Sequence, residues 1–147
     1  MRRRGRECAL QILYQMDLNR ELDAQVADER IDKALAHYWS SFESVVDEER
    51  AFAERLVRGV AKDLASVDEA IAKVSHHWRV GRMEKVDKAL IRLAAYEILR
   101  CPDIPRAASI NEAIEIAKRF SGKDSAAFIN GVLDQLEREG ATGAGGV

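Results

Sequence analysis

The amino terminus is the part of the sequence whose residue types best suit binding chemistry. Four of the first six residues are arginines, namely Arg2, Arg3, Arg4 and Arg6. A guanidinium group keeps its charge and presents several N–H donors in one plane, which matches the oxygens of a phosphate. We expect a short flexible arm that contacts phosphates and becomes ordered on RNA. The alternative is a solubilising terminus without a ligand.

The uneven distribution of charge favours the arm as a binding element. The whole chain has a net charge of −2, which predicts neither a nucleic acid nor a membrane as partner. Residues 1–20 contain five arginines against Glu7 and Asp17, a net charge of +3, so the rest of the chain carries −5. The average composition therefore hides a basic segment.

Two aromatic residues lie off the apolar stripes of their predicted helices. At about 100° per residue, Tyr14 falls roughly opposite the stripe of its helix and is either core or part of a partner surface. Phe128 lies near Lys118 and Lys123, and is either the edge of the core or a ring on which a base stacks. Asp124 suits the cap of the last helix.

The sequence offers no constellation for catalysis or metal binding. Its only histidines are His37, His76 and His77, and two adjacent histidines on a helix point about 100° apart, so they cannot share a ligand. No glycine-rich phosphate loop, zinc-protease motif or serine-nucleophile elbow is present. We predict a protein that is not an enzyme, with no catalytic residue, cofactor or metal.

Composition indicates a soluble cytoplasmic protein. The 147 residues are 47% hydrophobic and 33% charged, enough for one folded domain. The two cysteines, Cys8 and Cys101, lack metal-ligand spacing and are expected to be buried thiols, as in a reducing cytosol. No apolar export segment follows the basic start, and no stretch is long enough to span a membrane.

Apolar spacing of three and four residues recurs along the chain and predicts an all-α fold of six or seven helices. The expected helices cover roughly residues 5–19, 23–42, 47–64, 66–78, 84–100, 109–121 and 125–139. The segment 84–100 is apolar on nearly every side and should be the buried centre. We place one domain at residues 1–140 and a disordered glycine-rich tail at 141–147.

Local signals set the expected helix ends. Asp47 is expected to cap its helix, and Ser66 and Ser109, each followed three residues later by glutamate, form capping boxes. Gly122 is the expected stop of the helix before it. Gly59 and Gly131 are expected where helices approach closely.

Five blocks of the sequence, in order, resemble the NusB family. They are RRGRECALQILYQMD at 3–17, FAERLVRGV at 52–60, VDKALIRLAAYE at 86–97, INEAIEIAK at 110–118 and FINGVLD at 128–134. The blocks cover essentially the whole chain. The least family-like part is residues 20–46.

The resemblance implies two helical subbundles packed into one domain, and a function without any enzymatic step. It implies binding to boxA RNA of nascent ribosomal RNA, together with the small-subunit ribosomal protein that acts as NusE. The pair would join the RNA polymerase antitermination complex. The RNA-binding residues implied by this resemblance are Arg3, Arg4, Arg6, Lys118, Asp124 and Phe128. The implied residues of the ribosomal-protein interface are Tyr14 and Asp87.

Two other functions remain open from the sequence. A NusB-like domain also occurs ahead of the catalytic domain of RNA methyltransferases, although this chain ends at Val147 without a glycine-rich cofactor loop. The apolar rows of the first helix could alternatively serve a homodimer. The oligomeric state is left undecided.

Overall fold

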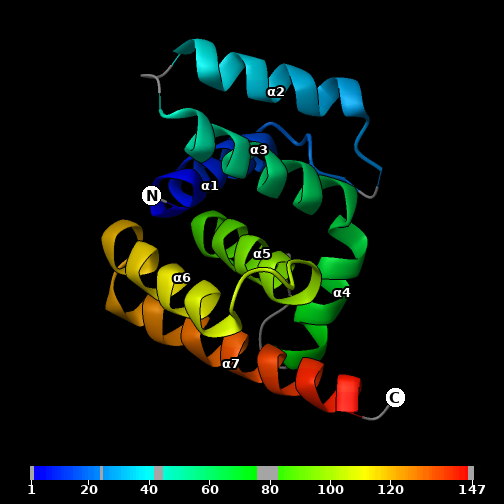
Figure 1. The fold of residues 1–147 in the computed structure, drawn as a ribbon, viewed down its shortest axis with the longest axis vertical. Coiled ribbons are helices and arrows are strands. Elements are labelled where there is room, and N and C mark those ends of the chain that lie inside the picture. Colours follow the sequence, from blue (N-terminus) through cyan, green and yellow to red (C-terminus); the bar gives the residue numbers. More distant parts are fainter. Residues whose placement is uncertain (1, 24, 42–44, 76–82, 146–147) are drawn as a thin grey trace.

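A computed structural model of the chain describes residues 2–23, 25–41, 45–75 and 83–145, with the backbone alone from residue 140 onward. These residues form seven α-helices and no strand, as predicted (Figure 1). The helices are α1 (Arg2–Leu18), α2 (Asp28–Ser41), α3 (Asp47–Lys62), α4 (Leu64–Val74), α5 (Lys85–Arg100), α6 (Arg106–Phe120) and α7 (Lys123–Gly145). None of these helices is long and apolar enough to cross a membrane.

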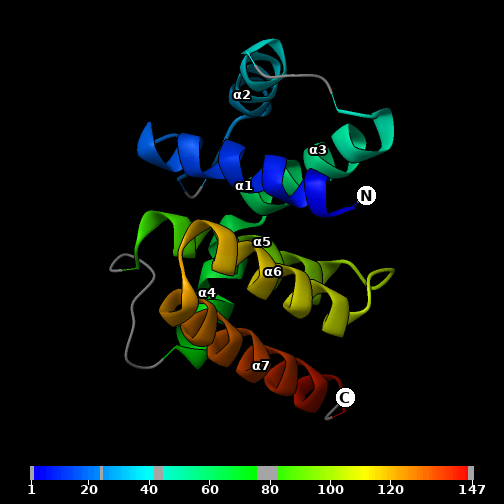
Figure 2. The same cartoon turned by 90° about the vertical axis from the view of Figure 1, so that its left-hand side faces the viewer.

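Helix α5 is the element around which the fold is organised. It packs against α1 and α3 on one side and against α4, α6 and α7 on the other. Figures 1 and 2 show α1, α2 and α3 as one group, with α4, α5, α6 and α7 as the second. The predicted two packed subbundles are therefore confirmed.

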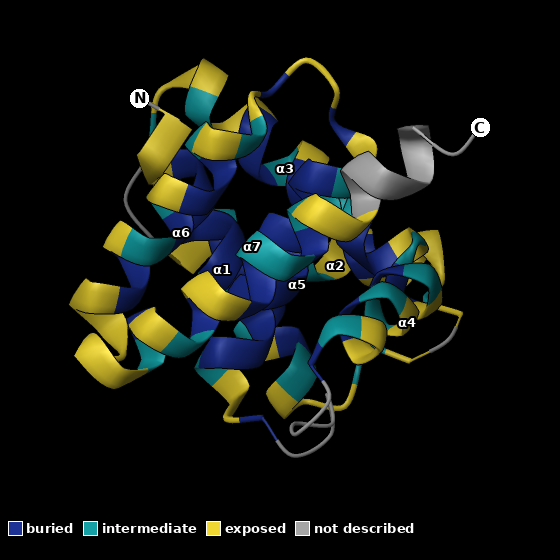
Figure 3. Cartoon of the chain, turned by 90° about the horizontal axis from the view of Figure 1, so that it is seen from below, coloured by how far each residue is buried: buried dark blue, intermediate teal, exposed yellow. Residues whose placement is uncertain are grey.

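The burial of α5 follows from its sequence, which is apolar on nearly all sides. Eleven of its residues are buried, and the buried segments meet in the middle of the domain (Figure 3). The stripe predicted for α1 is confirmed, since Ile12, Leu13 and Met16 are each 1% exposed. Cys8 and Cys101 are buried free thiols, as expected.

Both predicted capping boxes are wrong. Helix α4 begins at Leu64 and α6 at Arg106, so Ser66 and Ser109 lie inside their helices. Each hydroxyl is used in a contact distant in sequence instead. Ser66 Oγ accepts a hydrogen bond from Arg100 Nη2 at 2.9 Å, and Ser109 Oγ donates one to Glu97 Oε1 at 2.8 Å.

Other helix ends also differ from the prediction. Asp47 and Asp124 lie in the first turns of α3 and α7 rather than at the cap. In the first turn a carboxylate still interacts favourably with the helix dipole. Helix α4 ends at Val74, before the predicted end at Trp78, which is outside the described residues. Helix α7 continues through Gly140 to Gly145. A helix tolerates such glycines, because each lowers its stability by only about 1 kcal/mol relative to alanine. The predicted disordered tail is thus helical as far as Gly145.

The glycines divide into those that the fold requires and those that it tolerates. Gly122 has a φ of +106° and follows the end of α6, which confirms the predicted stop. A Cβ at Gly59 would lie 2.0 Å from the ring of Tyr96, so the close approach expected there is confirmed. The close approach expected at Gly131 is wrong, because a Cβ there would meet nothing within 4 Å.

We predict opposite effects of alanine at the two helical glycines. Gly59→Ala should lower the free energy of unfolding by about 1–3 kcal/mol, because the ring of Tyr96 must move. Gly131→Ala has free space around it and should raise this free energy by up to about 1 kcal/mol through helix propensity. Urea denaturation followed by circular dichroism measures both. Equal effects would contradict the close packing of α3 against α5.

Candidate functional site

The arginines at the amino terminus belong to a folded helix, so the predicted flexible arm is wrong. Arg2, Arg3 and Arg4 form the first turn of α1 and are exposed. Arg3 pairs with Glu112 of α6 through two hydrogen bonds, from Nε at 2.6 Å and from Nη2 at 3.1 Å. The first turn is held by a side chain remote in sequence, which local patterns could not predict.

Arg6 occupies a different environment from its neighbours. It is 4% exposed, and its Nε and Nη2 donate to the carboxylate of Glu97 at 2.9 and 2.7 Å. Ser109 donates a third hydrogen bond to the same carboxylate. A buried charge needs such partners because water no longer solvates it. This cluster therefore joins α1, α5 and α6.

Glu7 connects the start of α1 to the end of α6. Its carboxylate is 7% exposed and lies 2.5 Å from Arg119 Nη1 and 3.7 Å from Arg4 Nη1. Phe120, the next residue, is 44% exposed, and the Arg119 guanidinium lies 5.5 Å from the centre of its ring. The sequence reasoning missed Arg119 and Phe120, although a basic and an aromatic residue side by side before Gly122 could have indicated them.

Arg3, Arg4 and Arg119 are joined to the carboxylates of Glu112 and Glu7 by these contacts, and together with the sequence neighbours of Arg119 they form what we call the basic surface. It consists of Arg3, Arg4, Lys118, Arg119 and Phe120. All five side chains are exposed, and Lys118 pairs with Glu115 on its own helix at 3.4 Å. Four cations beside an exposed ring can contact phosphates and stack on a base.

A second feature, which we call the acidic cavity, lies between α5 and α7 and has a volume of about 390 Å³. It brings together three predicted residues, Asp87, Asp124 and Phe128. Asp87 is 8% exposed, and its Oδ2 accepts a hydrogen bond from Ser125 Oγ at 3.1 Å. Its Oδ1 is buried and receives no donor from the described part of the chain. An unsatisfied buried acceptor is costly, and the carboxylates of Glu84 and Asp124 add to that of Asp87 in giving the cavity an acidic lining.

Tyr14 is half-buried and packs against the core, so it is both edge of the core and surface. The neighbouring turn of α1 contacts the start of α5, because Asp17 Oδ2 lies 3.0 Å from Lys88 Nζ. Tyr14 lies one turn before Asp17, and Asp87 precedes Lys88 in the sequence, whereas the basic surface lies at the other end of α1.

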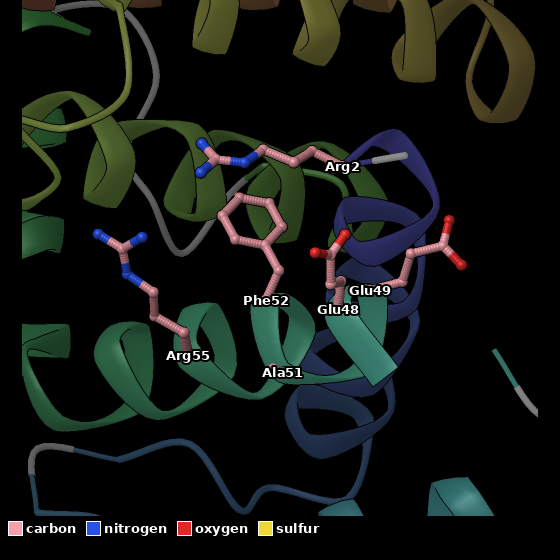
Figure 4. A pocket seen from close by; sticks show the side chains of 6 residues that line it. All are labelled: Arg2, Glu48, Glu49, Ala51, Phe52 and Arg55. Atoms are coloured by element: carbon pink, nitrogen blue, oxygen red, sulfur yellow. The ribbon is translucent and has the colours of Figure 1, made fainter. Parts of the chain in front are cut away.

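A third hollow, of about 410 Å³, opens between the start of α1 and α3 (Figure 4). Arg2 extends over the ring of Phe52, 4.9 Å from its centre. Arg55 is paired with Asp103, and Glu48 and Glu49 line the opposite side. Arg2 therefore faces α3 and not the basic surface. Within the described residues, no cluster of histidine, cysteine or acidic side chains could hold a metal ion.

The described residues thus form an all-helical domain that carries a basic surface and a separate acidic cavity. The NusB family model matches residues 3–138. Transcription antitermination protein NusB of Anaeromyxobacter dehalogenans is 51% identical over 92% of this chain and 89% of its own length. That of Citrifermentans bemidjiense is 45% identical over 92% of each. The chain belongs to the NusB family.

Solved structures have the same fold. NusB of T. maritima matches with a TM-score of 0.79 and 32% identity, covering 95% of this chain and 92% of that one. A structure of the antitermination factors NusB and NusE in complex with double-stranded RNA matches with a TM-score of 0.73 and 19% identity. It covers 94% of this chain and 96% of that one.

We predict that the two kinds of arginine differ in their effect on stability. Arg6→Ala leaves the Glu97 carboxylate buried without a counter-charge and should lower the free energy of unfolding by about 3–5 kcal/mol. Arg3→Ala removes an exposed pair and should change it little. Denaturant unfolding of both variants measures the difference. Similar losses would contradict a structural role confined to Arg6.

Proposed function

We propose that this chain is a transcription antitermination factor that binds boxA RNA of nascent ribosomal RNA together with the ribosomal protein acting as NusE. The pair would then join the RNA polymerase antitermination complex in the cytoplasm. The basic surface carries this proposal, because it gathers arginines and an exposed ring at the junction of two helices. The names of the relatives and the NusB–NusE–RNA complex with the same fold support it.

On the RNA side, Arg3, Arg4 and Arg119 contact phosphates, and Lys118 adds a further charge. Phe120 is the exposed ring proposed for base stacking. Phe128, which lines the acidic cavity, is the aromatic residue that the resemblance assigns to RNA. Asp124 is exposed in the first turn of α7 and lines the cavity beside Phe128. The resemblance assigns Arg6 to RNA, but in this proposal Arg6 fixes α1, because it is buried and Glu97 takes its Nε and Nη2 donors.

On the protein side, the acidic cavity takes a basic side chain or a backbone N–H of the ribosomal protein. The acidic lining of the cavity attracts a positive charge, and the half-buried ring of Tyr14 on α1 is the aromatic residue proposed for the same partner. The function needs no chemical step. A methyltransferase role has no support among the described residues, and self-association through α1 would compete with the ribosomal protein for Tyr14.

Removing two arginines from the basic surface should weaken RNA binding and its salt dependence together. Each phosphate neutralised on single-stranded RNA adds roughly 0.7 to the slope of log affinity against log salt. The variant Arg3→Ala/Arg4→Ala should therefore lose about 1 from this slope, while Arg6 keeps the fold intact. Fluorescence anisotropy of labelled boxA RNA at several salt concentrations measures it.

The matched control removes two exposed arginines elsewhere, in α2 and α7. Arg30→Ala/Arg138→Ala changes the net charge equally and should leave the slope nearly unchanged. Phosphate contacts position RNA without reading its sequence, so the loss should be similar for matched and scrambled RNA. An unchanged slope in the Arg3/Arg4 variant would assign RNA binding to another surface.

Changes at Tyr14 and Asp87 should weaken the complex with the ribosomal protein. We expect about 1–3 kcal/mol for Tyr14→Ala, typical of an aromatic interface residue, and a loss for Asp87→Asn through the missing charge. Calorimetric titration with the ribosomal protein measures both, with Asp32→Asn on α2 as the control. Light scattering that finds a stable homodimer broken by Tyr14→Ala would favour self-association instead.

A further inference from the structure

Three arginine–carboxylate pairs hold the start of α1, and they differ in exposure. The side chains of Arg6 and Glu97 are 5% and 1% exposed. In the pair of Arg119 with Glu7, only the carboxylate is buried, at 7%. The side chains of Arg3 and Glu112 are 47% and 25% exposed. Of these three pairs, only that of Arg3 with Glu112 exposes both side chains to solvent and therefore to an incoming phosphate.

The geometry of the Arg3–Glu112 pair decides what a phosphate must do there. Nε and Nη2 of Arg3 each donate to one oxygen of Glu112. This side of the guanidinium is also one that binds two oxygens of a phosphate in parallel. A carboxylate and a phosphate cannot occupy it together, because both are anions and both need the same donors.

We propose that Glu112 occupies an RNA-phosphate site in the free protein and leaves Arg3 when RNA binds. This inference rests on the proposed function and identifies one of its phosphate sites. Glu112 is then an internal competitor that lowers the affinity of the basic surface for RNA.

The electrostatics of the pair agree with an occupied site. The Arg3 guanidinium holds the pKa of the Glu112 carboxyl below its usual range, chiefly through the hydrogen bonds between them. Glu112 therefore stays ionised near neutral pH and keeps its hold on Arg3. Breaking this pair costs little, because exposed ion pairs contribute weakly. The competition is thus weak enough for RNA to win.

Glu112→Gln tests this exchange, because the amide has nearly the same shape without the charge. Removing the competitor should tighten binding of boxA RNA about two- to fivefold, the range expected for an exposed ion pair. The salt slope should become steeper by up to about 0.7. In the unsubstituted protein, RNA binding frees the Glu112 carboxylate to take up a cation, and in the variant this uptake is missing. Anisotropy titrations at several salt concentrations measure both quantities.

Two controls separate the contact from general electrostatics. Asp134→Asn removes a carboxylate from another exposed pair, with Arg138 on α7 at 3.2 Å, and should change affinity less than Glu112→Gln. In an Arg3→Ala background, Glu112→Gln should lose most of its effect, because the site that it frees no longer exists.

The sign of the effect decides between competition and orientation. If Glu112→Gln weakens RNA binding, the carboxylate orients Arg3 for RNA and the proposal is overturned. An equal gain in the Arg3→Ala background would overturn it as well, since the gain would then be a long-range charge effect. If the unsubstituted protein binds no RNA, the proposed function itself fails and this inference fails with it.

Discussion

The buried ion pair between Arg6 and Glu97 is the interaction on which the arrangement of the functional surfaces depends. Two charges removed from water must satisfy each other closely, and Ser109 supplies a further donor to the carboxylate. The three residues come from α1, α5 and α6, so the pair fixes the start of α1 against both helices. Arg3, in the preceding turn, is thereby held beside Glu112 of α6.

Burial then divides similar ion pairs into structural and exchangeable ones. Arg6 and Glu97 lie inside the domain, where loss of either partner leaves a charge without a counterion. Arg3 and Glu112 use the same chemistry at the surface, where water screens the pair and another anion can replace the carboxylate. One run of arginines thus supplies both a fold-stabilising residue and residues available to RNA.

Helix α1 also connects the two proposed interfaces. Its start lies in the basic surface, and its second half, with Tyr14, packs against the beginning of α5, where Asp87 lines the acidic cavity. Phe128 and Asp124 line the same cavity from α7. Asp87, which the family resemblance assigns to the protein interface, therefore lies beside two residues that it assigns to RNA.

The sequence alone determined the family, the all-helical class, the central position of α5 and the stop at Gly122. These depend on apolar periodicity and on backbone preferences that act between near neighbours. Only the tertiary structure decided that Arg6 is buried, that Ser109 serves Glu97 instead of a helix start, and that Arg119 joins the basic surface. Each depends on a contact between helices remote in the sequence, 91 residues apart for Arg6 and Glu97, and no local pattern specifies which distant side chain a residue will meet.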